Sequence, residues 1–98
     1  MARAAAPAEI RAGVLHVNGA PLCAVGTPEW RAWLADPESR AFRFQGARGA
    51  LSARRERQRN GWYWYAYRRA GGRLRKAYLG RDEDLSLARL ESVAAALA

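Results

Sequence analysis

The chain has 98 residues, half of them apolar, and a formal net charge of +8. This length allows one domain, residues 1–98, with a single modest core, and it is too short for a buried catalytic pocket plus a substrate domain. The apolar content argues against wholesale disorder. No stretch approaches the roughly 18 to 20 apolar residues of a membrane span, and the first residues lack the apolar run of a signal peptide, so we expect a cytoplasmic protein with no membrane partner.

Residues 1–10 are rich in alanine and show no clean period, so we expect a flexible tail. Residues 14–36 are expected to form a β-hairpin followed by a short helix. Asn18-Gly19 stands between two β-forming runs and predicts the hairpin turn, because both turn positions need positive φ. Thr27-Pro28 predicts the start of the helix, and Asp36-Pro37 its end. The stripe of Trp30, Trp33 and Leu34 at helical spacing predicts core packing.

Residues 41–98 are expected to form a basic sheet covered by a helix. Phe42-Arg43-Phe44 predicts a short strand, and Asn60-Gly61 predicts a tight turn between residues 51–59 and the aromatic run that follows. Gly71-Gly72 predicts a second turn, which gives a three-stranded meander. The last helix is predicted by apolar residues on one face after the cap Ser86, namely Leu87, Leu90, Val93, Ala94 and Leu97. The expected class is α+β, with an antiparallel sheet of three or four strands; whether the N-terminal hairpin joins it stays open.

Twelve of the 17 basic residues fall between Arg43 and Arg81, a segment that holds a single acid, Glu56, and therefore has a net charge of +11. Such a concentration of cations repels itself unless a polyanion is near, and nucleic acid is the commonest polyanion for a small protein. Cys23 and His16 each stand alone, so we expect no disulfide, no metal and no cofactor. No glycine-rich phosphate loop or catalytic pair is present, so an enzyme is not expected.

A two-residue turn at Asn60-Gly61 would set Arg59 opposite Trp62 and Arg57 opposite Trp64. One face then carries Arg55, Arg57, Arg59, Trp62, Trp64 and Arg68, and the other carries Ser52, Arg54, Glu56, Gln58, Tyr63, Tyr65 and Tyr67. Burying arginines without partners is costly, whereas tyrosines can be buried with their hydroxyls at the rim, so we expect the arginine and tryptophan face to look outward.

The third strand of the meander has two possible registers. A two-residue loop at Gly71-Gly72 sends Arg73 and Arg75 to the outward face, and a shift by one residue sends Lys76 and Tyr78 there instead. Both registers stay open, so the expected nucleic-acid site includes Arg73, Arg75 and Lys76, together with Arg55, Arg57, Arg59, Trp62, Trp64 and Arg68.

The segment 61–80, with its alternating aromatics, its glycine loop, its basic return strand and Leu79-Gly80 before a helix, resembles the AP2-type DNA-binding domain and the arm-binding domains of tyrosine recombinases. That resemblance implies that the outer face of a three-stranded sheet docks in the DNA major groove. An N-terminal hairpin and helix depart from this pattern.

Fragments that span most of the chain are similar to the N-terminal region of large bacterial LuxR/MalT-type transcriptional regulators. They include Val25-Gly26-Thr27-Pro28-Glu29-Trp30, Trp33-Leu34, Phe42-Arg43-Phe44, Ser52-Ala53-Arg54-Arg55-Glu56, Trp62-Tyr63-Trp64-Tyr65-Ala66-Tyr67-Arg68 and Tyr78-Leu79-Gly80-Arg81. The resemblance implies a regulatory context. This sequence departs from those regulators because it carries no nucleotide-binding module and no C-terminal helix-turn-helix.

The leading hypothesis is therefore a module that binds nucleic acid, duplex DNA foremost, in transcriptional regulation. RNA or single strands are the nearby variant, since tryptophans can stack on bases. The alternative is a protein-interaction module that binds a regulator or a second copy of itself, because tryptophan, tyrosine and arginine are also the residues of interface hot spots.

Overall fold

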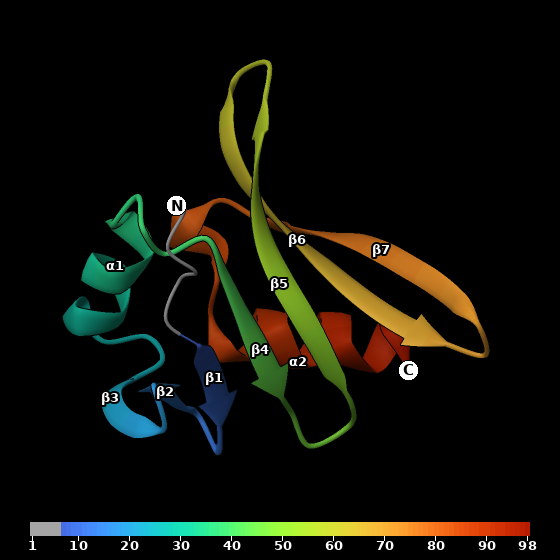
Figure 1. Cartoon of the computed structure of the whole chain (residues 1–98), viewed down its shortest axis with the longest axis horizontal. Helices are drawn as coiled ribbons and strands as arrows, with labels where there is room; N and C mark the ends of the chain where they lie inside the picture. Colours follow the sequence, from blue (N-terminus) through green and yellow to red (C-terminus); the bar gives the residue numbers. More distant parts are fainter. Residues whose placement is uncertain (1–6) are drawn as a thin grey trace, which may run out of the picture.

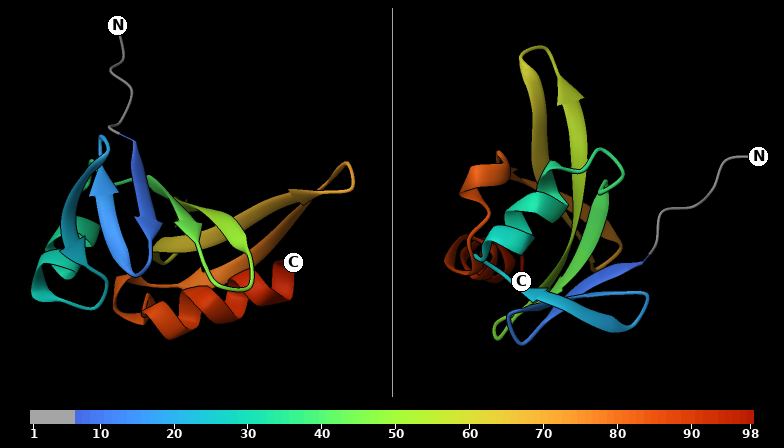
Figure 2. Two further views of the ribbon diagram at one scale, coloured as in Figure 1. Left: turned by 90° about the horizontal axis from the view of Figure 1, so that it is seen from below. Right: turned by 90° about the vertical axis from the view of Figure 1, so that its left-hand side faces the viewer.

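The computed structural model of the chain describes residues 7–98. Within them, one mixed sheet is covered on one face by two α-helices (Figures 1 and 2). The strands are β1 (Ala8–Arg11), β2 (Val14–Val17), β3 (Ala20–Ala24), β4 (Ala41–Gln45), β5 (Ala50–Gln58), β6 (Gly61–Ala70) and β7 (Arg73–Gly80), and the helices are α1 (Pro28–Ala35), the 3-10 turn η1 (Asp82–Asp84) and α2 (Leu87–Leu97). The strand order is β3-β2-β1-β4-β5-β6-β7, antiparallel except for the parallel pair of β1 and β4.

The α+β class is as expected, but the sheet has seven strands among the described residues rather than three or four. The difference lies in the N-terminal strands, which join the main sheet where β1 runs parallel to β4. Residues Ala8 to Ile10, expected as part of the tail, lie in β1, and residues 1–6 of that tail lie outside the described part. A four-residue strand carries too little alternation to be recognised in sequence, and its partner β4 lies about thirty residues further along.

The N-terminal hairpin of β2 and β3 confirms the turn at Asn18-Gly19, whose φ angles are +54° and +81°. Helix α1 begins as predicted, with the Thr27 hydroxyl accepting from the backbone N–H of Trp30 at 3.3 Å. Trp30 and Leu34 are buried, which confirms their place in the core, and Trp33 packs at its margin.

The two long hairpins position the candidate site. Gln58 lies opposite Gly61, so the first turn is Arg59-Asn60 and not Asn60-Gly61. The pairing is thereby displaced by two residues, and a displacement by two leaves every side chain on the face it was expected to share. Ala70 lies opposite Arg73, which confirms the two-residue loop at Gly71-Gly72. A bulge beside Trp64 then inserts Leu79 into the buried face.

The core lies between the sheet and the helices. Helix α2 begins at its cap Ser86, whose hydroxyl accepts from Arg89 N–H at 3.1 Å, and it packs mainly against β7. Its buried residues are Leu90, Val93, Ala94 and Leu97. On the sheet side, Phe42, Phe44, Leu51, Ala53, Trp64, Ala66 and Leu79 are buried beneath the helices. The result is a two-layer domain whose sheet has one covered and one open face (Figure 2).

Candidate nucleic-acid interface

The expectation that the arginine and tryptophan face looks outward is wrong. Arg55, Trp64 and Ala66 do share a face, but it is the face covered by the helices, and Trp64 has no exposed surface. The reason lies in the neighbouring residues: the same face continues through Leu51, Ala53 and Ala66, which are all buried. A strip of apolar and small side chains is what a helix can pack against, and it decides which side is covered.

Arg55 is accommodated on this covered face because it finds partners. Its Nη2 donates to the carbonyl of Ser39 at 2.6 Å, to that of Asp36 at 3.1 Å and also to that of Leu34. These carbonyls belong to the end of α1 and the loop after it, where backbone acceptors have no partner within the helix. The guanidinium also lies 5.0 Å from the ring centroid of Trp64. Arg55 therefore ties α1 to the sheet: the three carbonyls satisfy its Nη2, while its Nε is buried with no hydrogen-bond partner within residues 7–98.

The other expected residues of this face lie toward the ends of the two hairpins. Arg57, Arg59 and Trp62 are on the β5–β6 hairpin, which projects beyond the helices (Figure 1), and Trp62 is 55% exposed. Arg57 lies 5.8 Å from the ring centroid of Trp62. Arg73 and Arg75 are exposed on β7, and Arg75 reaches the carbonyl of Leu97 at 3.5 Å. Arg68 donates to the carbonyl of Ala50 at 2.8 Å.

The uncovered face of β4 to β7 is the larger of the two candidate functional surfaces, and we call it the open face. Its members follow from the strand pairing: Arg43, Ser52, Arg54, Glu56, Tyr63, Tyr65, Tyr67, Arg69, Leu74, Lys76 and Tyr78. All four tyrosines of the chain are among them. A phenol tolerates half-exposure because its ring packs while its hydroxyl meets water, which suits it to a face without a helix.

Two cations of the open face, Lys76 and Arg54, lie over its tyrosine rings. Lys76 Nζ lies 4.4 Å from the ring centroid of Tyr65 and 5.4 Å from that of Tyr67, and Arg54 approaches Tyr67 at 5.9 Å. Cation–π contacts of this kind hold long side chains in place while their charge stays in water. Lys76 was one of the expected site residues, and it is the one that the structure places on the open face.

One acid, Glu56, lies among the residues of β4 to β7, and it is already partnered. Its carboxylate pairs with Lys76 Nζ at 3.2 Å and accepts from the Tyr67 hydroxyl. The remaining open-face cations, Arg43, Arg54 and Arg69, are exposed and make no ion pair within residues 7–98. The face therefore keeps a positive potential.

Arg81, directly after β7, extends this surface. Its Nη2 donates to the Tyr63 hydroxyl at 3.1 Å, and its guanidinium lies 5.3 Å from the Tyr63 ring centroid. The hydrogen bond to Tyr63 raises the pKa of Arg81 further above its ordinary value. Like every arginine at neutral pH, Arg81 is charged, and it lies at the rim of the open face.

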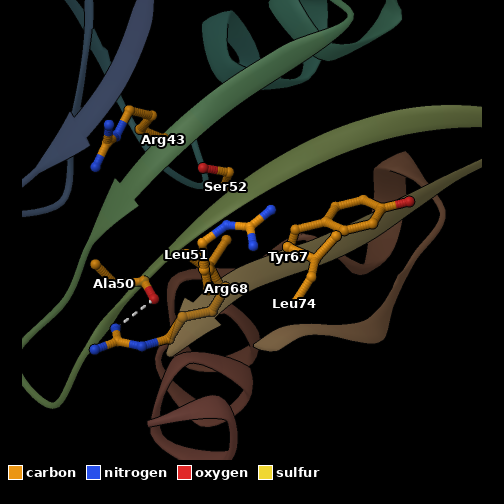
Figure 3. A pocket seen from close by; sticks show the side chains of 8 residues that line it. Arg43, Ala50, Leu51, Ser52, Tyr67, Arg68 and Leu74 are labelled. Carbon is orange, nitrogen blue, oxygen red and sulfur yellow. Dashed lines mark hydrogen bonds between the residues drawn. The ribbon is translucent and has the colours of Figure 1, made fainter. Parts of the chain in front are cut away.

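A shallow hollow of about 440 Å³ crosses the open face and is lined by residues of β4 to β7 (Figure 3). Figure 3 shows Arg43, Ser52, Tyr67 and Leu74 around it, with Arg68 bonded to the carbonyl of Ala50. Arg69 also lines it. Two guanidiniums beside a serine hydroxyl and a tyrosine ring form a surface that can hold a phosphate group.

Side-chain alternation correctly groups Tyr63, Tyr65 and Tyr67 on one face, but the prediction that this face lies under the helix is wrong. The feature of the sequence that identifies the open face lies on the opposite face. There, small or aliphatic residues point to the same side of the strands as the tryptophans. Ala53 and Ala66 lie opposite each other and make room for a helix, whereas Arg54 and Tyr65, opposite each other on the open face, do not.

Residues 7–98 contain neither a metal-binding cluster nor a helix that could span a membrane. No three side chains of histidine, cysteine, aspartate or glutamate in this part gather closely enough to hold a metal ion. None of its helices has the length and apolar character of a membrane span.

Comparison with known proteins places the chain by family. Neither the curated proteins nor the solved structures contain a match, and nothing in these comparisons links the chain to AP2-type domains or LuxR/MalT regulators. A family model described as "Domain of unknown function (DUF6788)" matches residues 27–89, from the cap of α1 into α2. That stretch includes the whole open face and every strand from β4 to β7. The chain therefore belongs to the DUF6788 family.

Proposed function

We propose that this domain binds nucleic acid, duplex DNA foremost, through the open face of its sheet. The observation that supports this most is the exposed cationic surface of β4 to β7 and Arg81, in which the single acid is paired with Lys76. Because sequence-independent affinity for DNA comes from neutralising phosphates, an ordered layer of cations with few acids is the feature to expect.

Duplex is favoured over single strands by the state of the tyrosine rings. Proteins that bind single strands offer free aromatic faces on which bases stack. Here Tyr63, Tyr65 and Tyr67 each have a cation over the ring, and Tyr65 and Tyr78 pack edge to face at 5.6 Å. These rings hold Arg54, Lys76 and Arg81 in place, where the three cations can contact the phosphate backbone.

The test is a salt titration of binding to a random-sequence duplex, followed by fluorescence anisotropy. Five cations on the surface, Arg43, Arg54, Arg69, Lys76 and Arg81, predict that the logarithm of affinity falls with the logarithm of salt at a slope of about −4 to −5. Arg54→Ala and Lys76→Ala should each reduce the slope by about 1.

Arg31→Ala is the matched control, because Arg31 is exposed on α1, in the helical layer on the other side of the sheet. It removes the same charge and should leave the slope unchanged. Absence of duplex binding at low salt, or an equal loss with Arg31→Ala, would contradict the proposal. Tighter binding to single strands than to duplex would replace duplex DNA by single strands as the ligand.

The second candidate is self-association through the edge of the sheet, and one observation favours it. β7 is an edge strand with two exposed apolar side chains, Leu74 at 58% and Tyr78 at 47%. Unpaired edges with apolar side chains are sites where another strand can add. A dimer in sedimentation analysis that persists in high salt and is lost on Leu74→Lys would support this candidate, and a monomer at all concentrations would remove it.

A further inference from the structure

A second hollow lies on the side of the sheet opposite the open face, between the β5–β6 hairpin and the loop after α1. Its volume is about 620 Å³, and it is lined by Ala35, Pro37, Arg40, Arg55 and Trp62. This volume falls in the range of about 300 to 1,000 Å³ typical of small-ligand sites. Nothing in the proposed function uses this space, which we call the Trp62 hollow.

The walls of the Trp62 hollow are of two kinds. Trp62, with 55% of its surface exposed, supplies a broad aromatic face, and Ala35 and Pro37 add apolar surface. Arg57 lies 5.8 Å from the Trp62 ring centroid, but the indole is still exposed, whereas Tyr63, Tyr65 and Tyr67 on the open face are only half-exposed beneath their cations. Trp62 differs in this from Trp30 and Trp64, which are buried in the core. A flat aromatic ring is the ligand group that such a wall fits best.

The other walls are cationic. Arg40 is exposed, and its side chain makes no ion pair or hydrogen bond to residues 7–98. Arg55 is fixed by the carbonyls of the preceding helix, and its Nε is buried with no hydrogen-bond partner in the described chain. No acid lines the hollow, so the ligand group beside the aromatic ring should carry negative charge.

We propose that the Trp62 hollow binds a single nucleotide unit, with its base stacked on Trp62 and its phosphate on Arg40, supported by Arg55. A nucleotide carries a planar ring and an anion in one molecule, which matches the aromatic and the cationic walls of the hollow. The site is distinct from the open face because the two lie on opposite sides of the sheet.

The test uses adenosine monophosphate, adenosine and inorganic phosphate as separate probes, followed by NMR of the indole and guanidinium N–H signals. Adenosine monophosphate should shift the Trp62 and Arg40 signals saturably, and adenosine and phosphate alone should each bind at least about tenfold more weakly. Trp30 and Trp64, whose indole N–H groups are bonded inside the protein, serve as internal references that should not shift.

Two variants test the assignment. Trp62→Leu and Arg40→Ala should each weaken binding by about tenfold or more, which corresponds to the loss of one base–aromatic stack or one charged hydrogen bond. Both residues are exposed, so both variants should keep the dispersed spectrum of the folded domain. Arg73→Ala, an equal loss of charge at the tip of the other hairpin, is the matched control and should bind as the parent does.

The proposal is overturned if adenosine monophosphate shifts no signal of the hollow, if it shifts the Arg43 and Arg54 signals instead, or if Trp62→Leu binds equally well. Stronger binding of an acidic peptide containing tryptophan would also overturn it. Duplex binding measured on the same variants separates this site from the open face: Trp62→Leu and Arg40→Ala should keep the salt slope that Arg54→Ala reduces.

Discussion

Trp64 and Asp82 are joined by a hydrogen bond of 2.7 Å from the indole Nε1 to the carboxylate Oδ1. The indole has no exposed surface, and Nε1–H is its one polar group, so this bond is what allows the whole ring to enter the core. Asp82 lies in η1, the turn between β7 and α2. The bond therefore fixes the central strand of the basic region to the segment that leads into the covering helix.

Asp82→Ala should lower the free energy of unfolding by about 1 to 3 kcal/mol, because it leaves the indole N–H buried without an acceptor. Asp82→Asn keeps an acceptor at the same position and should cost clearly less. Urea unfolding followed by tryptophan fluorescence measures both. Equal stability of the alanine variant and the parent would show that water replaces the carboxylate.

Arg55→Ala should also lower the free energy of unfolding, by about 1 to 3 kcal/mol, since the carbonyls after α1 lose their shared donor. Arg57→Ala is the matched control from the same strand face, because Arg57 is exposed on the hairpin and its guanidinium lies over Trp62 and not on the carbonyls after α1. It should change stability by less than about 0.5 kcal/mol. Urea unfolding distinguishes them, and equal values for the two would contradict the anchoring role of Arg55.

Glu56→Gln should tighten duplex binding on the order of two- to fivefold at low salt, because it removes the one acid of the open face. The amide can still accept from the Tyr67 hydroxyl, and the lost pair with Lys76 lies at the surface, so the stability cost should stay below about 1 kcal/mol. Anisotropy at several salt concentrations gives the effect. Glu38→Gln, in the loop after α1, should leave the affinity for duplex nearly unchanged. An equal gain in affinity with this variant would show that the net charge of the domain, and not the open face, sets the affinity.

Gly80→Ala should destabilise the domain more than Gly71→Ala, although both glycines have positive φ. Gly80 has φ +128°, and an added Cβ would lie 2.7 Å from Asp84 Cβ. Gly71 has φ +58° and open space around it, so an alanine at this position would add only the strain of the left-handed region, about 1 kcal/mol. Thermal unfolding of the two variants measures the difference, and equal melting temperatures would mean that η1 shifts freely.

Cys23 should react slowly with iodoacetamide at pH 8. Burial raises the pKa of its thiol, with Glu29 acting in the same direction against a hydrogen bond with Thr27. A raised pKa leaves less thiolate at a given pH, and the thiolate is the reacting form. The alkylation rate of the folded protein should be several-fold below that of the urea-unfolded chain and should climb with pH. Equal rates in both states would contradict a shielded thiol.

Much of the local structure follows from the sequence. Asn18-Gly19 predicts its turn because both residues must adopt positive φ, and Thr27-Pro28 predicts the start of α1 because a hydroxyl cap and a proline suit the first turn of a helix. The grouping of residues into two faces is equally determined, because side chains alternate along any strand. A register error of two residues at Arg59-Asn60 did not disturb that grouping.

The sequence could not place the N-terminal strands in the main sheet. β1 pairs in parallel with β4 across about thirty residues of chain, and such contacts leave no local pattern in the sequence. Nor could it show that Arg55 finds three carbonyls, because these come from α1 and its following loop.

By itself, then, the sequence determined which side chains stand together and that a basic surface exists. Only the tertiary structure decided which face is open. An arginine is costly to bury without partners, and for that reason we expected the face of Arg55 and Arg57 to be exposed. In the structure, however, the end of α1 holds Arg55, and Arg57 lies beyond the helices. The cost of burial therefore does not decide which face is covered. Packing decides which face the helices cover: Ala53 and Ala66 leave room for a helix, and the tyrosines with their cations lie on the face that meets water.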